Sequence, residues 1–249
     1  RMYWISLPNR IIALDQASSI IITVLFIFVC VNAINVMDGL DGLASGVVAI
    51  GASAMFTYTY VLAREQNFVV ATTASLVTVT TTGVCLGFLP HNFHRARMFM
   101  GDAGSMLLGL LLSCSSLSFT GQIDSQSLNP EGAGLLPNWL PLLLPFAIMA
   151  LPLFDLATAF IRRTWHGKWW FVADKQHLHH RLIQQGHSTI TAVWVLYLWS
   201  AVIAYGAIAF GLVRLPIALV IVALGIIVAV LVTAGPGWRS EKKMRKSEK

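Results

Sequence analysis

The stretch Ile20-Ile21-Ile22-Thr23-Val24-Leu25-Phe26-Ile27-Phe28-Val29 decides the fold class, because it is apolar almost throughout and carries no charge. A membrane β-barrel strand needs about ten residues that alternate strictly between lipid-facing and lumen-facing types, and this stretch shows no such alternation. In a bilayer only helices and closed barrels satisfy all of their backbone hydrogen bonds. The stretch therefore predicts a membrane-spanning helix and an all-α fold.

The composition of the whole chain points to the same environment. Its 249 residues are 56% hydrophobic and only 11% charged, and the mean hydropathy is +0.71. A soluble domain carries roughly a quarter charged residues, and a single soluble core of this size cannot bury so much apolar surface. Disorder is excluded as well, since disordered chains are poor in hydrophobic residues.

Seven membrane spans are predicted from their length and lack of charge, and together they form a polytopic helical bundle. Their predicted limits are residues 17–36, 43–62, 68–89, 103–122, 137–160, 190–213 and 215–234. An integral membrane catalytic domain is expected over residues 1–236, and a basic cytoplasmic tail over 237–249.

The positions of the basic residues predict the orientation of the bundle. Of the 17 basic residues, only Arg1, Arg10, Arg64 and Arg214 lie on the side opposite the C-terminal tail, whereas all seven histidines lie on the tail side. Cytoplasmic loops are enriched in Lys and Arg, so the tail side is predicted to be cytoplasmic. The pI near 9.5 then reflects topology and attraction to anionic lipid and substrate, and no nucleic-acid partner is expected.

The first candidate motif joins the first two spans with the sequence NVMDGLDGL, residues 35–43. Asp38 and Asp41 are three residues apart, so on a helical turn they share one face and are able to hold a cation between them. Gly39 and Gly42 permit a tight turn and close approach of a ligand. The alternative is a polar turn whose aspartates cap the helices.

The second candidate motif is FMGDAGS, residues 99–105, where a basic loop enters the fourth span. Gly101, Gly104 and Ser105 at the start of a long helix form a natural phosphate cradle of backbone N–H groups. Asp102 is an unfavourable neighbour for phosphate unless a divalent cation bridges them, and carboxylate plus phosphate oxygens are the ligands that Mg²⁺ prefers. The alternative is an ordinary aspartate cap.

The third candidate motif is DKQHLHHR, residues 174–181, in the longest loop of the tail side. Its histidines, with Lys175 and Arg181, supply hydrogen-bond donors and positive charge for a diphosphate. A zinc site and a solvated basic loop without a role stay open as alternatives. Asp155 is the one acid inside a predicted span, and Arg162 lies on the same helical face, so a structural ion pair is its simplest interpretation.

Together these motifs resemble the polyprenyl-phosphate N-acetylhexosamine-1-phosphate transferases of glycosyltransferase family 4. Residues 35–43 match that family's N-x-x-D-G-x-D-G-L motif, and residues 99–105 match its F-x-G-D-x-G-S motif, with Asn92 at the usual distance upstream. The histidine loop has the H-x-H-H-x-L form, which looks like the branch that uses UDP-N-acetylglucosamine. The resemblance covers residues 17–235.

The resemblance implies a Mg²⁺-dependent reaction, with Mn²⁺ as a substitute, in the plasma membrane of a bacterium. N-acetylglucosamine-1-phosphate would pass from UDP-N-acetylglucosamine to a polyprenyl phosphate, releasing UMP, with the active site facing the cytoplasm. Asp102, Asn35 and Asp38 would bind the metal, and Asp38, Asp41 and Asp102 would be the catalytic residues. The substrate-binding residues would be Asn92, Phe99 (stacked on the uracil), Gly101, Gly104, Ser105, His177, His179, His180 and Arg181.

The chain departs from this family in two respects. Family members carry a D-D-x-x-D motif on an earlier loop and have ten or eleven spans, whereas this sequence lacks such a run and has seven predicted spans. The first spans are therefore expected to be missing, and a truncated gene product would need a complementing piece for catalysis. A homodimer is a further expectation. The alternative functions are a phospho-N-acetylmuramoyl-pentapeptide-type transferase, a transporter with intramembrane acids, and a structural fragment.

Overall fold

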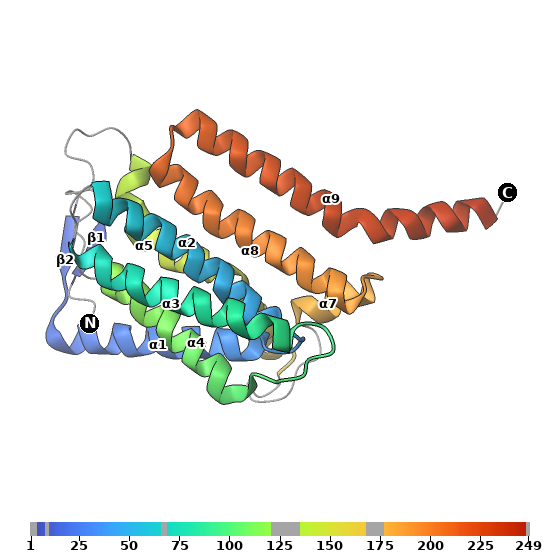
Figure 1. Cartoon of the computed structure of the whole chain (residues 1–249), viewed down its shortest axis with the longest axis horizontal. Coiled ribbons are helices and arrows are strands. Elements are labelled where there is room, and N and C mark those ends of the chain that lie inside the picture. Colours follow the sequence, from blue (N-terminus) through green and yellow to red (C-terminus); the bar gives the residue numbers. More distant parts are fainter. Residues whose placement is uncertain (1–3, 8–9, 66–68, 121–134, 168–176, 248–249) are drawn as a thin grey trace.

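The computed structural model describes residues 4–7, 10–65, 69–120, 135–167 and 177–247, and these residues form a helical bundle (Figure 1). A short antiparallel hairpin precedes the helices. The elements are β1 (Trp4–Leu7), β2 (Arg10–Ala13), α1 (Gln16–Met37), α2 (Leu43–Glu65), α3 (Val69–Asn92), α4 (Gly101–Thr120), α5 (Leu135–Ile148), α6 (Ala150–Trp165), α7 (Leu178–Gln184), α8 (Thr189–Leu212) and α9 (Leu215–Ser247).

The predicted all-α membrane fold is confirmed. Six of the described helices are long and apolar enough to cross a membrane, and a seventh span results if the bent pair α5 and α6 is counted as one. Each of these helices overlaps one of the predicted spans. The chain is therefore a multi-pass membrane protein. The predicted domain boundary at residue 236 falls inside α9, which runs from Leu215 to Ser247, and the division into two domains stays a prediction.

The first helix shows how the sequence sets an element's limits. The Asp15 side chain accepts hydrogen bonds from the backbone N–H groups of Ala17 and Ser18, which would otherwise have no partner at a helix start. The 22 residues that follow contain no charge. The helix ends at Met37, and its C-cap Asp38 directly precedes Gly39, the first glycine of the turn.

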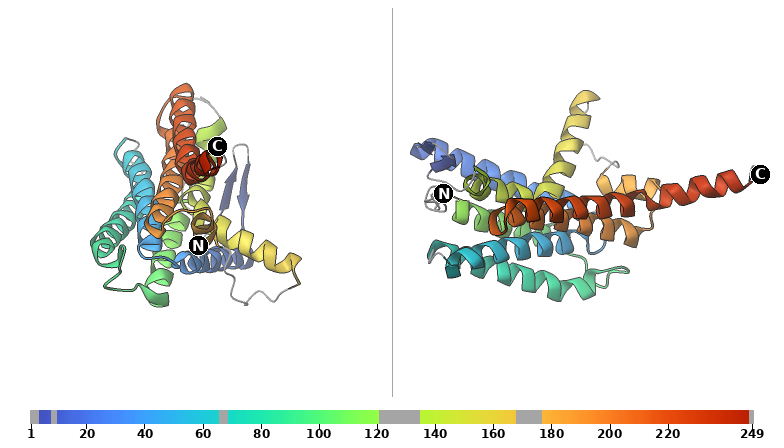
Figure 2. Two further views of the ribbon diagram at one scale, coloured as in Figure 1. Left: turned by 90° about the vertical axis from the view of Figure 1, so that its right-hand side faces the viewer. Right: turned by 90° about the horizontal axis from the view of Figure 1, so that it is seen from above.

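The predicted fifth span, 137–160, is wrong as a single helix. The structure breaks it at Met149, and the segments on either side are bent by 75°. Pro152 lies in the first turn of α6 and has no N–H to donate to the Ile148 carbonyl, and its ring would clash with that carbonyl in a continuous helix. As a result α6 points away from the rest of the bundle, as the view from above in Figure 2 shows.

The core of the bundle is built around α2. This helix packs against α3 and α8, and α1 packs against α4 along a seam so close that a Cβ on Gly109 would lie 2.8 Å from Cα of Val31. Within the spanning window, 61% of α2 is buried, against 22% for α1 and 11% for α9. Most of the apolar surface of α1 and α9 is therefore left uncovered by the described residues.

The helix ends that carry the candidate motifs lie together at one end of the bundle. The C-terminal ends of α1 and α3, the start of α4 and all of α7 gather there, and the C-terminal part of α9 extends beyond the bundle on the same side (Figure 1). The hairpin β1–β2 and the junction of α8 and α9 lie at the other end. The connections between spans therefore lie alternately at the two ends of the bundle, as the predicted spans require.

Gly46→Ala is expected to destabilise the bundle, because a Cβ on Gly46 would overlap the aromatic ring of Tyr197 on α8. Overpacking of this kind costs about 1–3 kcal/mol. The matched control is Gly83→Ala on α3, where a Cβ would meet nothing within 4 Å. Thermal unfolding in detergent, followed by intrinsic fluorescence, should show a lower midpoint for the Gly46 variant alone. Equal midpoints for the two variants would contradict the close α2–α8 contact.

Candidate active site

Two motifs that are far apart in sequence meet through the side chain of Asn35. Its amide Nδ2 donates hydrogen bonds to Oδ1 of Asp102 and to Oγ of Ser105, each at 3.0 Å. Ser105 is fully buried and also donates to the Gly101 carbonyl within its own helix. The C-terminal end of α1 is thereby fastened to the first turn of α4, and the side-chain Oδ1 of Asn35 accepts no hydrogen bond from the described residues.

Three carboxylates lie around this junction. Burial raises the pKa of Asp38, and the nearby charges of Asp102 and then Asp41 raise it further. Repulsion of this kind is relieved when a cation enters the cluster. Asp41 has a second task, because its Oδ2 accepts a hydrogen bond from the backbone N–H of Ala96 at 3.1 Å and so holds the loop between α3 and α4.

The donor set at this junction fits Mg²⁺ better than a metal that needs a full protein cage. Among the described residues no group of three or more His, Cys, Asp or Glu side chains is arranged to hold a metal ion. Mg²⁺ is commonly bound through one or two carboxylates, with substrate phosphates and water as the other ligands. The carboxylates of Asp38 and Asp102 and the side-chain Oδ1 of Asn35 are suited to that pattern.

Asn92 lies below the surface, where it holds the turn between α1 and α2. It is only 3% exposed, and its Oδ1 accepts from the backbone N–H of Gly42 at 3.0 Å and from Ser45 Oγ at 3.3 Å. Its Nδ2 donates to the Met98 carbonyl at 2.9 Å. The hydroxyl of Tyr197 donates to the Gly42 carbonyl from the other side. Gly42 has φ +77°, which favours glycine at this position.

Asp155 holds the histidine loop in place. The carboxylate is 2% exposed, with Oδ2 at 3.1 Å from Nδ1 of His177 and Oδ1 accepting from the backbone N–H of Leu178 at 2.8 Å. It therefore caps the start of α7 from the neighbouring helix α6. Sequence spacing had pointed to Arg162 as its partner. The signal for this role was present, since Asp155 is an isolated acid in an apolar stretch, but its partner lies 22 residues away.

His179 is the buried member of the histidine group. It is 3% exposed and packs so closely on the turn that a Cβ on Gly39 would lie 2.8 Å from its Cε1. Burial lowers the pKa of His179 to about 4, and the neighbouring His180 lowers it too. The ring is therefore neutral at pH 7. It lies nearly parallel to the His177 ring at a centroid distance of 5.8 Å and is tilted by 44° against the His180 ring at 4.3 Å. His177 and His180 are partly exposed, with 12% of the His177 side chain accessible.

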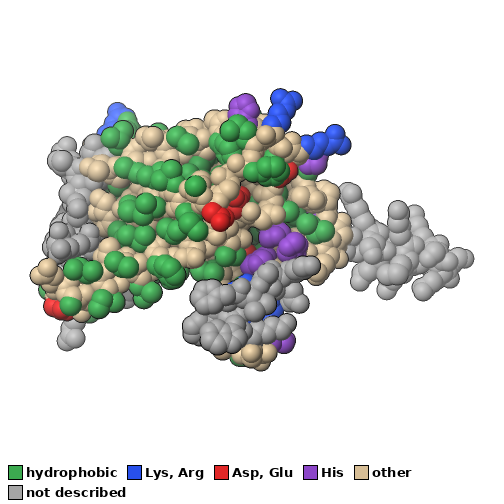
Figure 3. Space-filling model, turned by 90° about the horizontal axis from the view of Figure 1, so that it is seen from below, with side chains coloured by type: hydrophobic (Ala, Val, Ile, Leu, Met, Phe, Trp, Pro, Cys, Tyr) green, Lys and Arg blue, Asp and Glu red, His purple; other side chains and the backbone are tan. Residues whose placement is uncertain are grey.

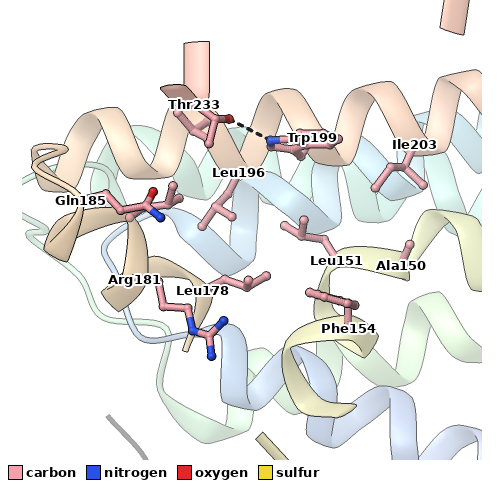
Figure 4. Close-up of a pocket in the computed structure, with 12 residues that line it drawn as sticks. Ala150, Leu151, Phe154, Leu178, Arg181, Gln185, Leu196, Trp199, Ile203 and Thr233 are labelled. Carbon is pink, nitrogen blue, oxygen red and sulfur yellow. Dashed lines mark hydrogen bonds between the residues drawn. The ribbon is translucent and has the colours of Figure 1, made fainter. Parts of the chain in front are cut away.

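The remaining predicted residues lie at the surface or face elsewhere. Phe99 is 81% exposed in the α3–α4 loop, and Gly101 at the start of α4 has φ +65° with open space beside it. Gly104 follows one turn later, against Met100. Arg181 lies on a different face of α7 from His179 and lines an apolar pocket (Figure 4). Lys175 lies outside the described residues.

The surface around the junction is more polar than the rest of this face of the bundle. Figure 3 shows hydrophobic side chains over most of this face, with carboxylates and histidines close together beside a region that is not described. Carboxylate and amide oxygens, imidazole rings and the backbone N–H groups at the start of α4 therefore converge at one end of an apolar bundle. This combination suits a substrate that carries phosphate groups and meets a membrane lipid.

Comparison with known proteins agrees with this geometry. Residues 2–120 match the family model described as glycosyl transferase family 4. This part of the chain is similar to glycosyl transferase family 4. The predicted resemblance is thereby confirmed, and the match includes the two aspartate motifs and Asn92.

Several curated relatives are similar over most of the chain. A decaprenyl-phosphate N-acetylglucosaminephosphotransferase of Mycobacterium tuberculosis is 44% identical over 90% of this chain and 55% of its own length. A probable undecaprenyl-phosphate N-acetylglucosaminyl 1-phosphate transferase of Bacillus subtilis is 39% identical over 75% of this chain and 46% of its own length. A phospho-N-acetylmuramoyl-pentapeptide-transferase of Synechococcus matches only 31% of this chain, at 49% identity, and 20% of its own length. The chain spans about half the length of the first two relatives.

Asn92→Leu is expected to loosen the turn between α1 and α2. The substitution removes the acceptor of the Gly42 N–H and the donor to the Met98 carbonyl, and each buried polar group left without a partner costs about 1–3 kcal/mol. The matched control is Asn32→Leu, because the Asn32 amide bonds to the Phe28 carbonyl on its own helix. Unfolding midpoints in detergent test the difference, and an Asn92 variant as stable as the control would contradict the bracing role.

Proposed function

We propose that the whole protein transfers N-acetylglucosamine-1-phosphate from UDP-N-acetylglucosamine to a polyprenyl phosphate, releasing UMP. The observation that carries the proposal is the junction of Asn35, Asp102 and Ser105, with Asp38 and Asp41 beside it. The names of the relatives that match most of the chain favour this sugar over the muramoyl-pentapeptide alternative. The reaction is assigned to the whole protein because the chain covers about half of those relatives.

In the proposed reaction an oxygen of the polyprenyl phosphate attacks the β-phosphorus of the nucleotide sugar. The new P–O bond replaces the bond to the bridging oxygen, which leaves with UMP. A phosphate monoester with a second pKa near 6 is already mostly a dianion at pH 7, so the nucleophile does not depend on a strong base. Positioning of two polyanions and neutralisation of their charge are then the main demands on the site.

The residues of the junction meet those demands in different ways. Asp38, Asp102 and Asn35 would hold Mg²⁺, which supplies charge neutralisation for the phosphates when bound. Gly101, Gly104 and Ser105 form the helix start that would receive a phosphate, and the accessible imidazoles of His177 and His180 would donate hydrogen bonds to it. His179 is neutral and buried, so its part is to hold the neighbouring rings.

Two further assignments follow from the surface and the topology. The exposed ring of Phe99 is available to stack on the uracil. Arg181 faces the apolar pocket and is left out of the proposed phosphate site. The motif end of the bundle is assigned to the cytoplasm because most basic residues lie on that side, which places the site where a water-soluble nucleotide sugar can reach it.

The transporter alternative fits the positions of the acids less well. Asp38 caps the end of α1, Asp41 lies in the following turn and Asp102 lies in the first turn of α4, all at one end of the bundle. An ion path is instead expected to place its acids near the bilayer midplane, at broken helices. Asp155, on the helix that follows the break between α5 and α6, is engaged by the start of α7.

Asp102→Asn in the full gene product is expected to lower Mg²⁺-dependent UMP release by about a hundredfold or more, because one anionic ligand and its electrostatic contribution are lost. The assay follows UMP released from UDP-N-acetylglucosamine in membranes supplied with polyprenyl phosphate. Asp15→Asn, at the other end of α1, is the matched control and keeps the helix cap. Full activity of the Asp102 variant would refute the metal assignment.

His180→Ala is expected to raise KM for UDP-N-acetylglucosamine by about tenfold or more, because a hydrogen bond to a charged phosphate is lost. Its control is His166→Ala, an exposed histidine at the end of α6. Initial rates at varied concentrations of each substrate separate the two possibilities. If only KM for the polyprenyl phosphate rises, the histidine loop serves the lipid and its assignment to the nucleotide is wrong.

A further inference from the structure

An apolar cavity of about 540 Å³ lies beside α7, between α6, α8 and α9 (Figure 4). Its walls include Leu151 and Phe154 from α6, Leu178 and Leu182 from α7, and Trp199 from α8. Leu178 and Leu182 are one helical turn apart on α7, whereas His179 lies on a different face and packs on Gly39. The cavity is therefore separate from the carboxylate junction.

A second hollow of about 450 Å³ adjoins the first. Both are bordered by Gln185, Trp199 and Thr233, and the second continues along α9 past Val230 and Ala234. The indole Nε1 of Trp199 donates to Thr233 Oγ1 at 3.0 Å, and Nε2 of the buried His187 lies 2.9 Å from the Thr233 carbonyl. These two bonds fix α9 against α7 and α8, so the double hollow is a built feature of the fold.

Among the described residues, the charge that borders this double hollow is positive. Arg181 is the single charged residue among the described residues that line either part, and its guanidinium makes no hydrogen bond or ion pair within the described part of the chain. The hollow lies at the motif end of the bundle, which most of the basic residues share. A partner with two apolar chains and a negative headgroup matches both the shape and the charge.

We propose that this double hollow binds a diacyl phospholipid with an anionic headgroup, one acyl chain in each part and the phosphate against Arg181. The first volume lies within the range of about 300–1,000 Å³ that is typical of small-molecule sites. A polyprenyl phosphate has a single chain and would leave one hollow empty. A zwitterionic phospholipid would bring a second positive charge to a site that already holds Arg181. The bound lipid would support α7 from the side opposite His179.

Quenching of Trp199 by brominated lipids tests the proposal without any assay of activity. The detergent-solubilised chain is titrated with phosphatidylglycerol brominated on its acyl chains. We expect saturable quenching that is lost in Trp199→Phe and kept in Trp194→Phe, since Trp194 lies on α8 against Phe93 and lines neither hollow. Arg181→Ala should raise the half-saturating concentration about fivefold, the effect of one basic residue on an anionic lipid, and Arg214→Ala at the far end of α8 should not.

Two results would overturn the proposal. Equal quenching by brominated phosphatidylcholine, unaffected by Arg181→Ala, would mean that Trp199 meets only the bulk lipid around the bundle. Displacement of the brominated lipid by an equimolar amount of polyprenyl phosphate would mean that the cavity takes the single chain of that lipid. Displacement by unlabelled phosphatidylglycerol alone supports the anionic phospholipid.

Discussion

The turn between α1 and α2 is the constraint on which the site depends, because it is a non-helical backbone segment at the end of an apolar bundle. Backbone groups in such a place need partners from the protein. Asn92 from α3 accepts from the Gly42 N–H, and Tyr197 from α8 donates to the Gly42 carbonyl. His179 covers Gly39. Three helices thus converge on one turn, and the positions of Asp38 and Asp41 follow from it.

The same convergence creates an electrostatic cost at Asp38. Asp38, Asp41 and Asp102 lie close enough for their charges to raise the pKa of Asp38. The nearest imidazole above the turn, His179, is neutral at pH 7 because burial lowers its pKa. Mutual repulsion among three acids is unfavourable, and a divalent ion bound among them relieves it. This imbalance is the physical support for the proposed Mg²⁺ site.

Much of the fold could be predicted because membrane spans obey simple rules of length and charge. The break in the fifth span could not, since Pro152 is compatible with the first turn of a new helix as well as with a kink. The meeting of the two aspartate motifs followed from loop parity. Asn92, Asp155 and His179 are buried and act through contacts with other helices and turns. Spacing along the sequence carries no information about those contacts.

The break between α5 and α6 connects these features. Because α6 turns away at Met149, Asp155 on α6 meets the start of α7 and holds His177, while Leu151 and Phe154 on α6 line the apolar cavity. A continuous span would direct α6 across the bilayer and remove both contacts. Two faces of α7 therefore contact different parts of the structure. His179 packs on the aspartate turn, and Leu178 and Leu182 line the cavity. A ligand that fills the cavity would contact the same short helix that carries His179, and that helix is capped by the buried Asp155.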